Sequence, residues 1–320
     1  MNQQLPKVYV SILNWNNYRN TIACLQSLQE SKYENMHLVV IDNGSQDVSV
    51  DEIKRAFADI KIIQSGENLG FAGGHQLVVE QALKDGAELV WILNNDAHVL
   101  PDTLVALVGS YRKEHFAIYG SVPFRDSETT TIASTSWAVD EQGRSIPEKL
   151  KIYRDMPYNE ILALGDRIQV ANLNGSSMLI PTAIVREYGF MDSSFFLYQE
   201  ETDYCFRLGA AGIPSYLVSK SVVIHKGHGS SQSHERLKPI LTYYYTRNYL
   251  VRVKRYWPSA LYRAIVWKML RQNWKHWIKS VLRLGQHSQM DSDSYYKLLG
   301  FWDGLWSQLG KRFDPADFIN

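Results

Sequence analysis

The chain has 320 residues, of which 45% are hydrophobic and 21% are charged. This balance is typical of a folded globular protein and argues against extended disorder. The two cysteines, Cys24 and Cys205, are too few for a disulfide framework and lack metal-binding spacing, so we expect a reducing compartment.

The net charge of +1 hides an uneven distribution along the chain. Residues 1–235 contain 19 Lys and Arg against 28 Asp and Glu, whereas residues 236–290 contain 12 Lys and Arg and no acidic residue. This polarity predicts a catalytic body with a basic attachment surface. Residues 1–7 lack the features of a secretory signal, and no window approaches roughly 18 uninterrupted apolar residues, so we expect a cytoplasmic protein without a spanning segment.

Short apolar runs alternate with helical patterns over the first 120 residues. In chain order we expect a strand at 8–13, a helix at 18–30, strands at 37–41 and 60–63, a helix at 74–84 and a strand at 89–93, and Pro101 suits the first turn of another helix. This alternation predicts an α/β fold whose sheet is mostly parallel, with helices on both faces.

The second half of the chain is less regular. Residues 123–168 are polar and irregular, and the pattern then predicts a strand at 170–180, a helix at 200–211 and a strand at 216–224. From about residue 237 the pattern is helical to the end. We therefore expect an α/β domain over residues 1–235 and a basic, aromatic-rich helical region over 236–320.

Polar residues follow several of the predicted strands. Asn16, Asp42, the loop around Asn68 and Asp96 each lie just past a strand, and ligands bind at the carboxyl ends of strands in such sheets. A carboxylate at Asp42 can accept a hydrogen bond from a pyrimidine imide or a ribose hydroxyl. In isolation Asp-Asn-Gly is more typical of a helix cap or a turn, but its place in the convergent set favours a site.

A glycine-rich turn over residues 66–74 leads into a predicted helix. Its backbone N–H groups and the helix N-terminus can face phosphate, although a packing turn explains it equally well. The spacing is not Gly-x-Gly-x-x-Gly, so it does not support a dinucleotide-binding fold.

Two positions suit a divalent cation. Asp96 ends the cluster Asn94-Asn95-Asp96, and a cation held by a carboxylate neutralises a departing nucleoside diphosphate well. His225, also past a strand, is the candidate second ligand, although a single histidine there is more often structural.

Three carboxylates crowd the start of the helix predicted at 200–211. Acidic residues favour a first helical turn for dipole reasons alone. The preceding segment 194–198 is apolar, however, which predicts a partly enclosed site where a carboxylate can act as a general base. The three acids are Glu200, Glu201 and Asp203.

Together these motifs resemble the family 2 glycosyltransferases with the GT-A fold, and among them the rhamnosyltransferase-like members. The resemblance covers about residues 7–231, and residues 243–248 also resemble the corresponding segment of this group. The motifs that carry it lie, in order, at residues 8–16, 40–45, 67–74, 93–96, 196–207 and 223–231.

The resemblance implies a role for each matching residue. Glu201 stands at the position of the catalytic base, where the family usually has Asp, so Glu200 stays open as an alternative. Asp96 and His225 are implied to hold a Mg²⁺ or Mn²⁺ ion. The implied donor-binding residues are Asn16, Asp42, Asn68, Gly73, Asn94 and Asn95, and the implied acceptor-binding residues are Asn174 and Gly175.

The implied activity is metal-dependent transfer of a sugar with inversion of the anomeric centre. The resemblance points to L-rhamnose from dTDP-rhamnose as donor and a lipid-linked glycan hydroxyl as acceptor, at the inner face of the cell membrane. A UDP-sugar donor remains the alternative.

Three other classes fit the sequence less well. A nucleotidyltransferase needs an N-terminal glycine-rich loop, and residues 9–17 contain no glycine. A non-catalytic nucleotide-sugar-binding scaffold would not need Glu201, Asp96 and His225 at the ends of strands or helices. A nucleic-acid-binding function would explain only the basic helical segment and none of the other motifs. We therefore expect no nucleic-acid partner.

The basic region predicts helices that lie on an anionic membrane without crossing it. The predicted apolar stripe is Val266, Leu270, Trp274, Trp277, Val281 and Leu284, and the basic stripe is Lys268, Arg271, Lys275, Lys279 and Arg283. The alternative is a helical hairpin that packs on the catalytic domain or in a homodimer.

Overall fold

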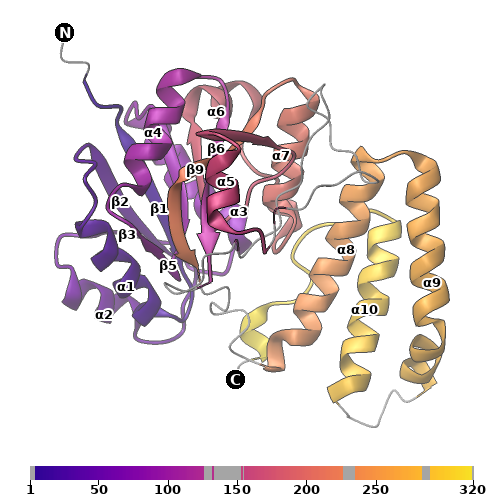
Figure 1. Ribbon diagram of the computed structural model, residues 1–320. Helices are drawn as coiled ribbons and strands as arrows, with labels where there is room; N and C mark the ends of the chain where they lie inside the picture. The colour runs from indigo at the N-terminus through magenta and orange to yellow at the C-terminus, as the bar shows by residue number, and fades with distance from the viewer. Residues whose placement is uncertain are drawn as a thin grey trace.

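The structure, a computed structural model, describes residues 4–125, 132, 153, 155–225, 235–282 and 289–318. Most of the irregular stretch predicted at 123–168, and residues 226–231 of the last motif, lie outside the described residues. In the described part, a central sheet with helices on both faces is followed by three long helices at its side (Figure 1).

The nine strands of the described residues form one mixed sheet. The strands β3, β2, β1 and β4 lie side by side and run parallel, as do β6 and β9, whereas β8, β5 and β7 pair antiparallel with their neighbours. The strand order is β3-β2-β1-β4-β8-β6-β9-β5, with β7 on β9. The bounds are β1 Val8–Asn14, β2 Met36–Asp42, β3 Lys61–Gln64, β4 Leu89–Asn94, β5 Ala97–Val99, β6 Ile118–Phe124, β7 Arg167–Val170, β8 Ser177–Pro181 and β9 Ser215–His225.

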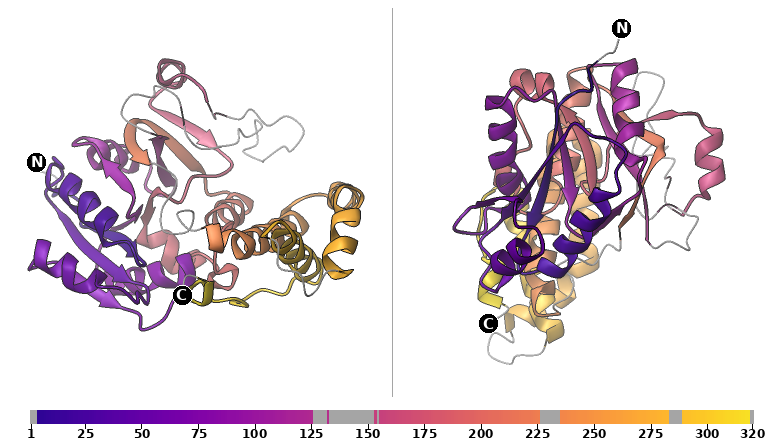
Figure 2. Two further views of the ribbon diagram at one scale, coloured as in Figure 1. Left: turned by 90° about the horizontal axis from the view of Figure 1, so that it is seen from below. Right: turned by 90° about the vertical axis from the view of Figure 1, so that its left-hand side faces the viewer.

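Helices cover both faces of the sheet (Figure 2). Along β1, Val8, Val10 and Ile12 pack toward α1 and α4, while Tyr9 belongs to the opposite layer with α3 and α7. Burial on both faces explains why β1 reads as a continuous apolar run. The helices are α1 Tyr18–Gln29, α2 Ser49–Ala56, α3 Gly70–Lys84, α4 Thr103–Lys113, α5 Tyr158–Ala163, α6 Thr182–Tyr188, η1 Ser193–Phe195 and α7 Glu200–Ala210.

The fold class is as expected, with local differences from the predicted elements. The single strand predicted at 170–180 is wrong: β7 ends at Val170 and β8 begins at Ser177. Between them Asn174 accepts a hydrogen bond from the backbone N–H of Ser176, a local turn that interrupts the strand. Helix α3 begins at Gly70 rather than Gly74, and Pro101 lies in the turn before α4.

The C-terminal region consists of three packed helices, with short 3-10 turns before and after them. They are η2 Glu235–Leu237, α8 Lys238–Tyr256, α9 Ser259–Leu282, α10 Gln289–Leu305 and η3 Pro315–Phe318. Helix α10 lies so close to α8 that a Cβ on Gly300 would be 2.4 Å from the Tyr243 carbonyl oxygen. The Tyr243 hydroxyl also donates to Asp303 at 2.5 Å. The chain leaves the helical path after Leu305, unlike the expectation of helix to the end.

Three residues of the predicted membrane-facing stripe of α9 pack inside the helical region, whereas Trp274 is exposed. Val266, Leu270 and Trp277 pack in a cluster with Leu250 of α8 and Phe301 of α10. The prediction that these three side chains lie on a membrane is therefore wrong, because the 3–4 spacing reflects helix packing. The side chains of Val281, Leu284, Lys279 and Arg283 lie outside the described residues.

Candidate active site

A cavity of about 320 Å³ opens at the carboxyl ends of β1 and β4. Helix α3, the segment 196–198 and the start of α8 form its other walls. Among the residues predicted from the sequence, Asn68, Asn94, Asn95, Asp96 and His225 line it. Of the residues predicted to converge at the strand ends, Asn68 and Asp96 therefore line one cavity.

Asp96 and His225 lie side by side at this cavity. The short strand β5 pairs Ala97 with His225, which places the residue before β5 next to the end of β9. One Asp96 carboxylate oxygen is 3.1 Å from His225 Nε2, and the Asn94 amide nitrogen is 3.2 Å from the same atom. Both ionisable side chains are mostly buried.

These groups fit a divalent cation. Carboxylate oxygen and imidazole nitrogen are both ligands for Mn²⁺, and the carboxylate also suits Mg²⁺. Within the described residues no group of three His, Cys, Asp or Glu side chains converges. Asp96 and His225 are thus two ligands of a site that needs more than two.

Asp42 and Asn16 belong to a polar network beside the cavity rather than to its lining. Asp42 is buried and accepts hydrogen bonds from the Asn14 side chain at 3.1 Å and the Ser45 backbone N–H at 3.3 Å. Asn16 has a left-handed backbone (φ 50°) and accepts from the backbone N–H of Gln46 at 2.8 Å. These contacts fix the loops that follow β1 and β2. The first residue after each of these two strands lines the cavity.

Two residues that the sequence did not single out, Trp15 and Asn43, line the cavity in their place. Asn43 is buried, donates to Gly70 O and Asn68 Oδ1 at 3.1 Å each, and accepts from the Leu69 backbone N–H at 3.0 Å. Asn68 in turn accepts from the Gly70 N–H at 2.9 Å. Asn43 therefore shapes the glycine-rich turn. Its position beside Asp42 in the Asp-Asn-Gly motif is the sequence feature from which it could have been predicted.

The remaining predicted donor residues have structural contacts. The Asn95 amide lines the cavity but donates to Thr21 Oγ1 at 3.0 Å, which ties it to α1. Gly73 lies inside α3, where its Cα faces Leu69 and Ser193, and it does not line the cavity.

The three acids at the start of α7 have different environments. Asp203 is buried and pairs with Arg255 of α8 at 2.9 Å, so it joins α7 to α8. Glu200 is 3% exposed, and burial, followed by the charge of Glu201, raises its pKa well above the usual range. Burial also raises the pKa of Glu201, which is less enclosed, and Arg252 opposes that shift. Burial therefore disfavours the charged form of both glutamates, and more strongly that of Glu200.

Gly175 adjoins Glu201, whereas the Asn174 side chain is used in its own turn. A Cβ on Gly175 would lie 3.5 Å from Glu201 Cγ and 3.3 Å from Phe71 Cζ. Phe71 lines the cavity, whereas Glu201 does not; the two side chains share Gly175 as a close neighbour. The absence of a side chain at Gly175 leaves room beside the carboxylate.

The segment before α7 has an unusual backbone. Phe196, Tyr198 and Gln199 all have positive φ values, of 64°, 67° and 74°. The Phe196 carbonyl accepts from the Phe71 N–H at 2.9 Å, and a Cβ on Gly70 would be only 2.2 Å from that oxygen. Only glycine fits at position 70, which also has φ 75°.

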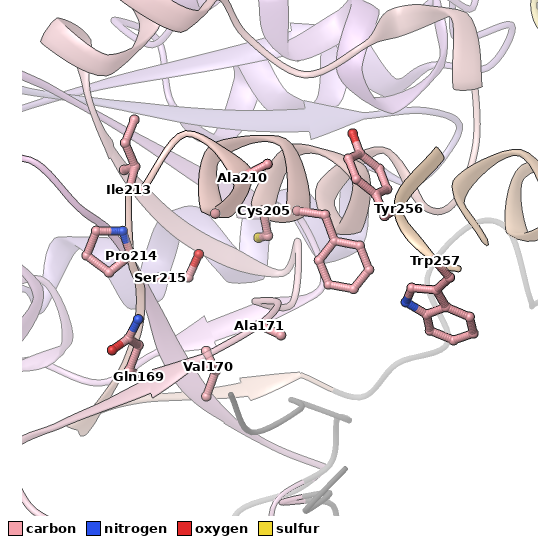
Figure 3. Close-up of a pocket in the computed structure, with 13 residues that line it drawn as sticks. Gln169, Val170, Ala171, Cys205, Ala210, Ile213, Pro214, Ser215, Tyr256 and Trp257 are labelled. Carbon is pink, nitrogen blue, oxygen red and sulfur yellow. The ribbon is translucent and has the colours of Figure 1, made fainter. Parts of the chain in front are cut away.

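A second cavity, of about 400 Å³, lies at the far end of α7 (Figure 3). Cys205, Tyr256 and Trp257 are on one side of it, and the start of β9 around Ser215 is on the other. Its lining contains no carboxylate, and Ser215 and His225 are at opposite ends of β9. Among the described residues that line it, this cavity therefore offers neither a carboxylate nor an imidazole.

The mixed sheet, with a cavity at its strand ends, places the chain in the α/β class. The sequence matches glycosyl transferase family 2 over residues 9–189, and the chain belongs to this family. It is 24% identical over 179 residues to the low-salt glycan biosynthesis hexosyltransferase Agl10 of Haloferax volcanii, covering 53% of this chain and 52% of that protein. The chain thus spans about half the length of this relative.

Other similar proteins agree with the family. The N-acetylglucosaminyl-diphospho-decaprenol L-rhamnosyltransferase of Mycobacterium tuberculosis is 23% identical over 231 residues, 65% of this chain and 72% of that one. The mannosyltransferase PcManGT of Pyrobaculum calidifontis, solved with GDP-Man and Mn²⁺, superposes with a TM-score of 0.58 at 13% identity, covering 96% of this chain and 89% of that chain. The structural likeness establishes the GT-A fold.

Proposed function

We propose that this chain is an inverting, metal-dependent glycosyltransferase that transfers L-rhamnose from dTDP-L-rhamnose to a hydroxyl of a lipid-linked glycan. The observation that carries the proposal is one cavity lined by Asp96 and His225, with Glu201 near the cavity-lining ring of Phe71 through their common neighbour Gly175. The rhamnosyltransferase relative supports both the sugar and the lipid-linked acceptor.

The chain's own residues suit a single displacement. Glu201 takes the proton of the acceptor hydroxyl while the hydroxyl oxygen bonds to the anomeric carbon and the bond to the diphosphate breaks. Attack opposite the leaving group inverts the centre, so a β-L-rhamnosyl donor gives an α-L-rhamnoside. Asp96 and His225 would hold the Mg²⁺ or Mn²⁺ ion, which supplies positive charge for the departing diphosphate.

A donor panel tests the proposal. The purified protein is incubated with Mn²⁺ or Mg²⁺, with N-acetylglucosaminyl-diphospho-decaprenol as the lipid-linked acceptor, and with each of dTDP-L-rhamnose, UDP-glucose, UDP-N-acetylglucosamine and GDP-mannose. Release of nucleoside diphosphate is measured. We expect dTDP release to exceed the others at least about 10-fold, because a pocket built for one sugar discriminates on that scale. Preferential UDP release would replace the rhamnose donor by a UDP-sugar, and no release from any donor would overturn the function.

We further propose that the exposed face of α9 binds an anionic membrane and so brings the site to its lipid-linked acceptor. Trp267 is 71% exposed, and Trp274 and Ile278 are 49% exposed. They alternate with exposed basic side chains, and the Lys275 ammonium lies 5.6 Å from the centre of the Trp274 ring. Tryptophan and basic side chains together are typical of interfacial helices. In the described part of the chain, no helix is both long and apolar enough to span a bilayer.

Flotation with vesicles containing phosphatidylglycerol checks this surface. We expect the protein to float at low salt and to detach as salt rises, since each basic residue near an anionic surface contributes about 1 kcal/mol. Replacing both Trp267 and Trp274 by Ser should abolish flotation. The matched control replaces Trp302 and Trp306, exposed tryptophans at the end of α10, and should float normally. Equal behaviour of the two variants would exclude the α9 face.

A further inference from the structure

The segment 195–199 reaches the cavity and leads directly into Glu200 and Glu201. Leu197 and Tyr198 are part of the cavity wall. Left-handed backbone at non-glycine residues is unfavourable for L-amino acids, and here it recurs at three of four consecutive positions, as described above. Such a conformation persists only when surrounding contacts hold it.

The holding contacts come from the helical C-terminal region. The buried Asn248 side chain of α8 donates to the carbonyl oxygens of Phe195, Leu197 and Tyr198 at 2.9, 2.8 and 2.8 Å. Three backbone oxygens thus converge on one amide group. Buried carbonyls without a donor are costly, so removing Asn248 would leave this conformation without its main support.

Arg247 also holds segment 195–199, and we call the contacts of Arg247 and Asn248 with this segment the clamp. Its guanidinium is buried, donates to the Phe195 carbonyl at 2.8 Å and to the Gly310 carbonyl at 2.6 Å, and its Nε donates to Asn248 Oδ1 at 2.8 Å. Arg247 therefore orients the Asn248 amide and ties the segment to the end of the chain. One turn further along α8, Arg252 donates to the Gln199 side chain at 2.6 Å.

We propose that Arg247 and Asn248 are positioning residues for the transfer reaction: they hold segment 195–199 in the conformation that places Glu201 beside the acceptor hydroxyl. The inference rests on the proposed role of Glu201 as base. It makes α8 part of the catalytic unit, so the helical region is more than an attachment surface. Neither residue lines the cavity, and both act through the backbone.

Kinetics of Asn248→Ala, measured as dTDP release from dTDP-L-rhamnose, test the clamp. We expect kcat to fall at least about 10-fold with the donor KM within about 3-fold, because small misplacement of a catalytic group lowers the rate far more than it weakens binding. Asn248→Ser, which keeps one hydroxyl donor, should recover part of the rate and serves if the alanine variant folds poorly. Asn273→Ala is the matched control, since Asn273 donates to Met269 O within α9, away from the segment.

A double-mutant cycle separates positioning from general loss of structure. In a Glu201→Gln background the base is already absent, so Asn248→Ala should lower kcat by less than about 3-fold further. An equal fold loss in both backgrounds would show that Asn248 does not act through Glu201 and would overturn the inference. If Glu201→Gln alone leaves kcat unchanged, the proposed base is wrong instead. If Asn248→Ala behaves like Asn273→Ala, the clamp has no catalytic role.

Discussion

Glu201→Gln is expected to lower kcat at least about 10²-fold while donor binding stays nearly intact, since a lost general base has effects of that size or more. Glutamine has nearly the same shape as glutamate but cannot take up the proton of the acceptor hydroxyl. The measurements are dTDP release under saturating donor and calorimetric binding of dTDP. Glu200→Gln is the matched control, because burial already favours the neutral form of that acid. Near-normal turnover of Glu201→Gln together with loss of activity in Glu200→Gln would reverse the assignment.

The pH profile gives a second readout of the same residue. The base must be deprotonated to act, so activity is present above the pKa of Glu201 and declines as pH falls through it. Burial raises that pKa, so the acidic limb of kcat should lie above the usual range of a glutamate. This limb should disappear from the residual activity of Glu201→Gln. A limb that persists there belongs to another group.

Asp96→Ala and His225→Ala are each expected to lower kcat about 10²-fold and to weaken the Mn²⁺-dependent binding of dTDP, because a group that stabilises leaving-group charge contributes on that scale. Titration of dTDP with and without Mn²⁺ measures the effect. Asp102→Ala is the control: Asp102 pairs with Lys32 at 2.8 Å, and both side chains are 63% exposed. Melting temperatures close to the parent would show that the fold is kept. Unchanged Mn²⁺ dependence in both site variants would remove them from the metal site.

Much of the fold was predictable because local patterns encode it. The apolar runs of β1, β2 and β4 were found to within a residue at each end. The prediction of a single strand at 170–180 was wrong. The turn that interrupts it is formed by one side chain and is too short to be visible in the apolar pattern of the sequence. The stripe on α9 was misassigned because membrane faces and helix-packing faces share the same periodicity.

The sequence by itself determined most strand ends and which acids and amides stand there, since these follow from residue type and local spacing, and its motifs carry the resemblance to the family. Only the tertiary structure decided which of them meet. Asp96 contacts His225 because a three-residue strand pairs with the end of β9, and Glu201 is presented by a left-handed segment that Asn248 holds from a distant helix. Such contacts join residues far apart in the chain, and neither propensity nor periodicity carries information about that pairing.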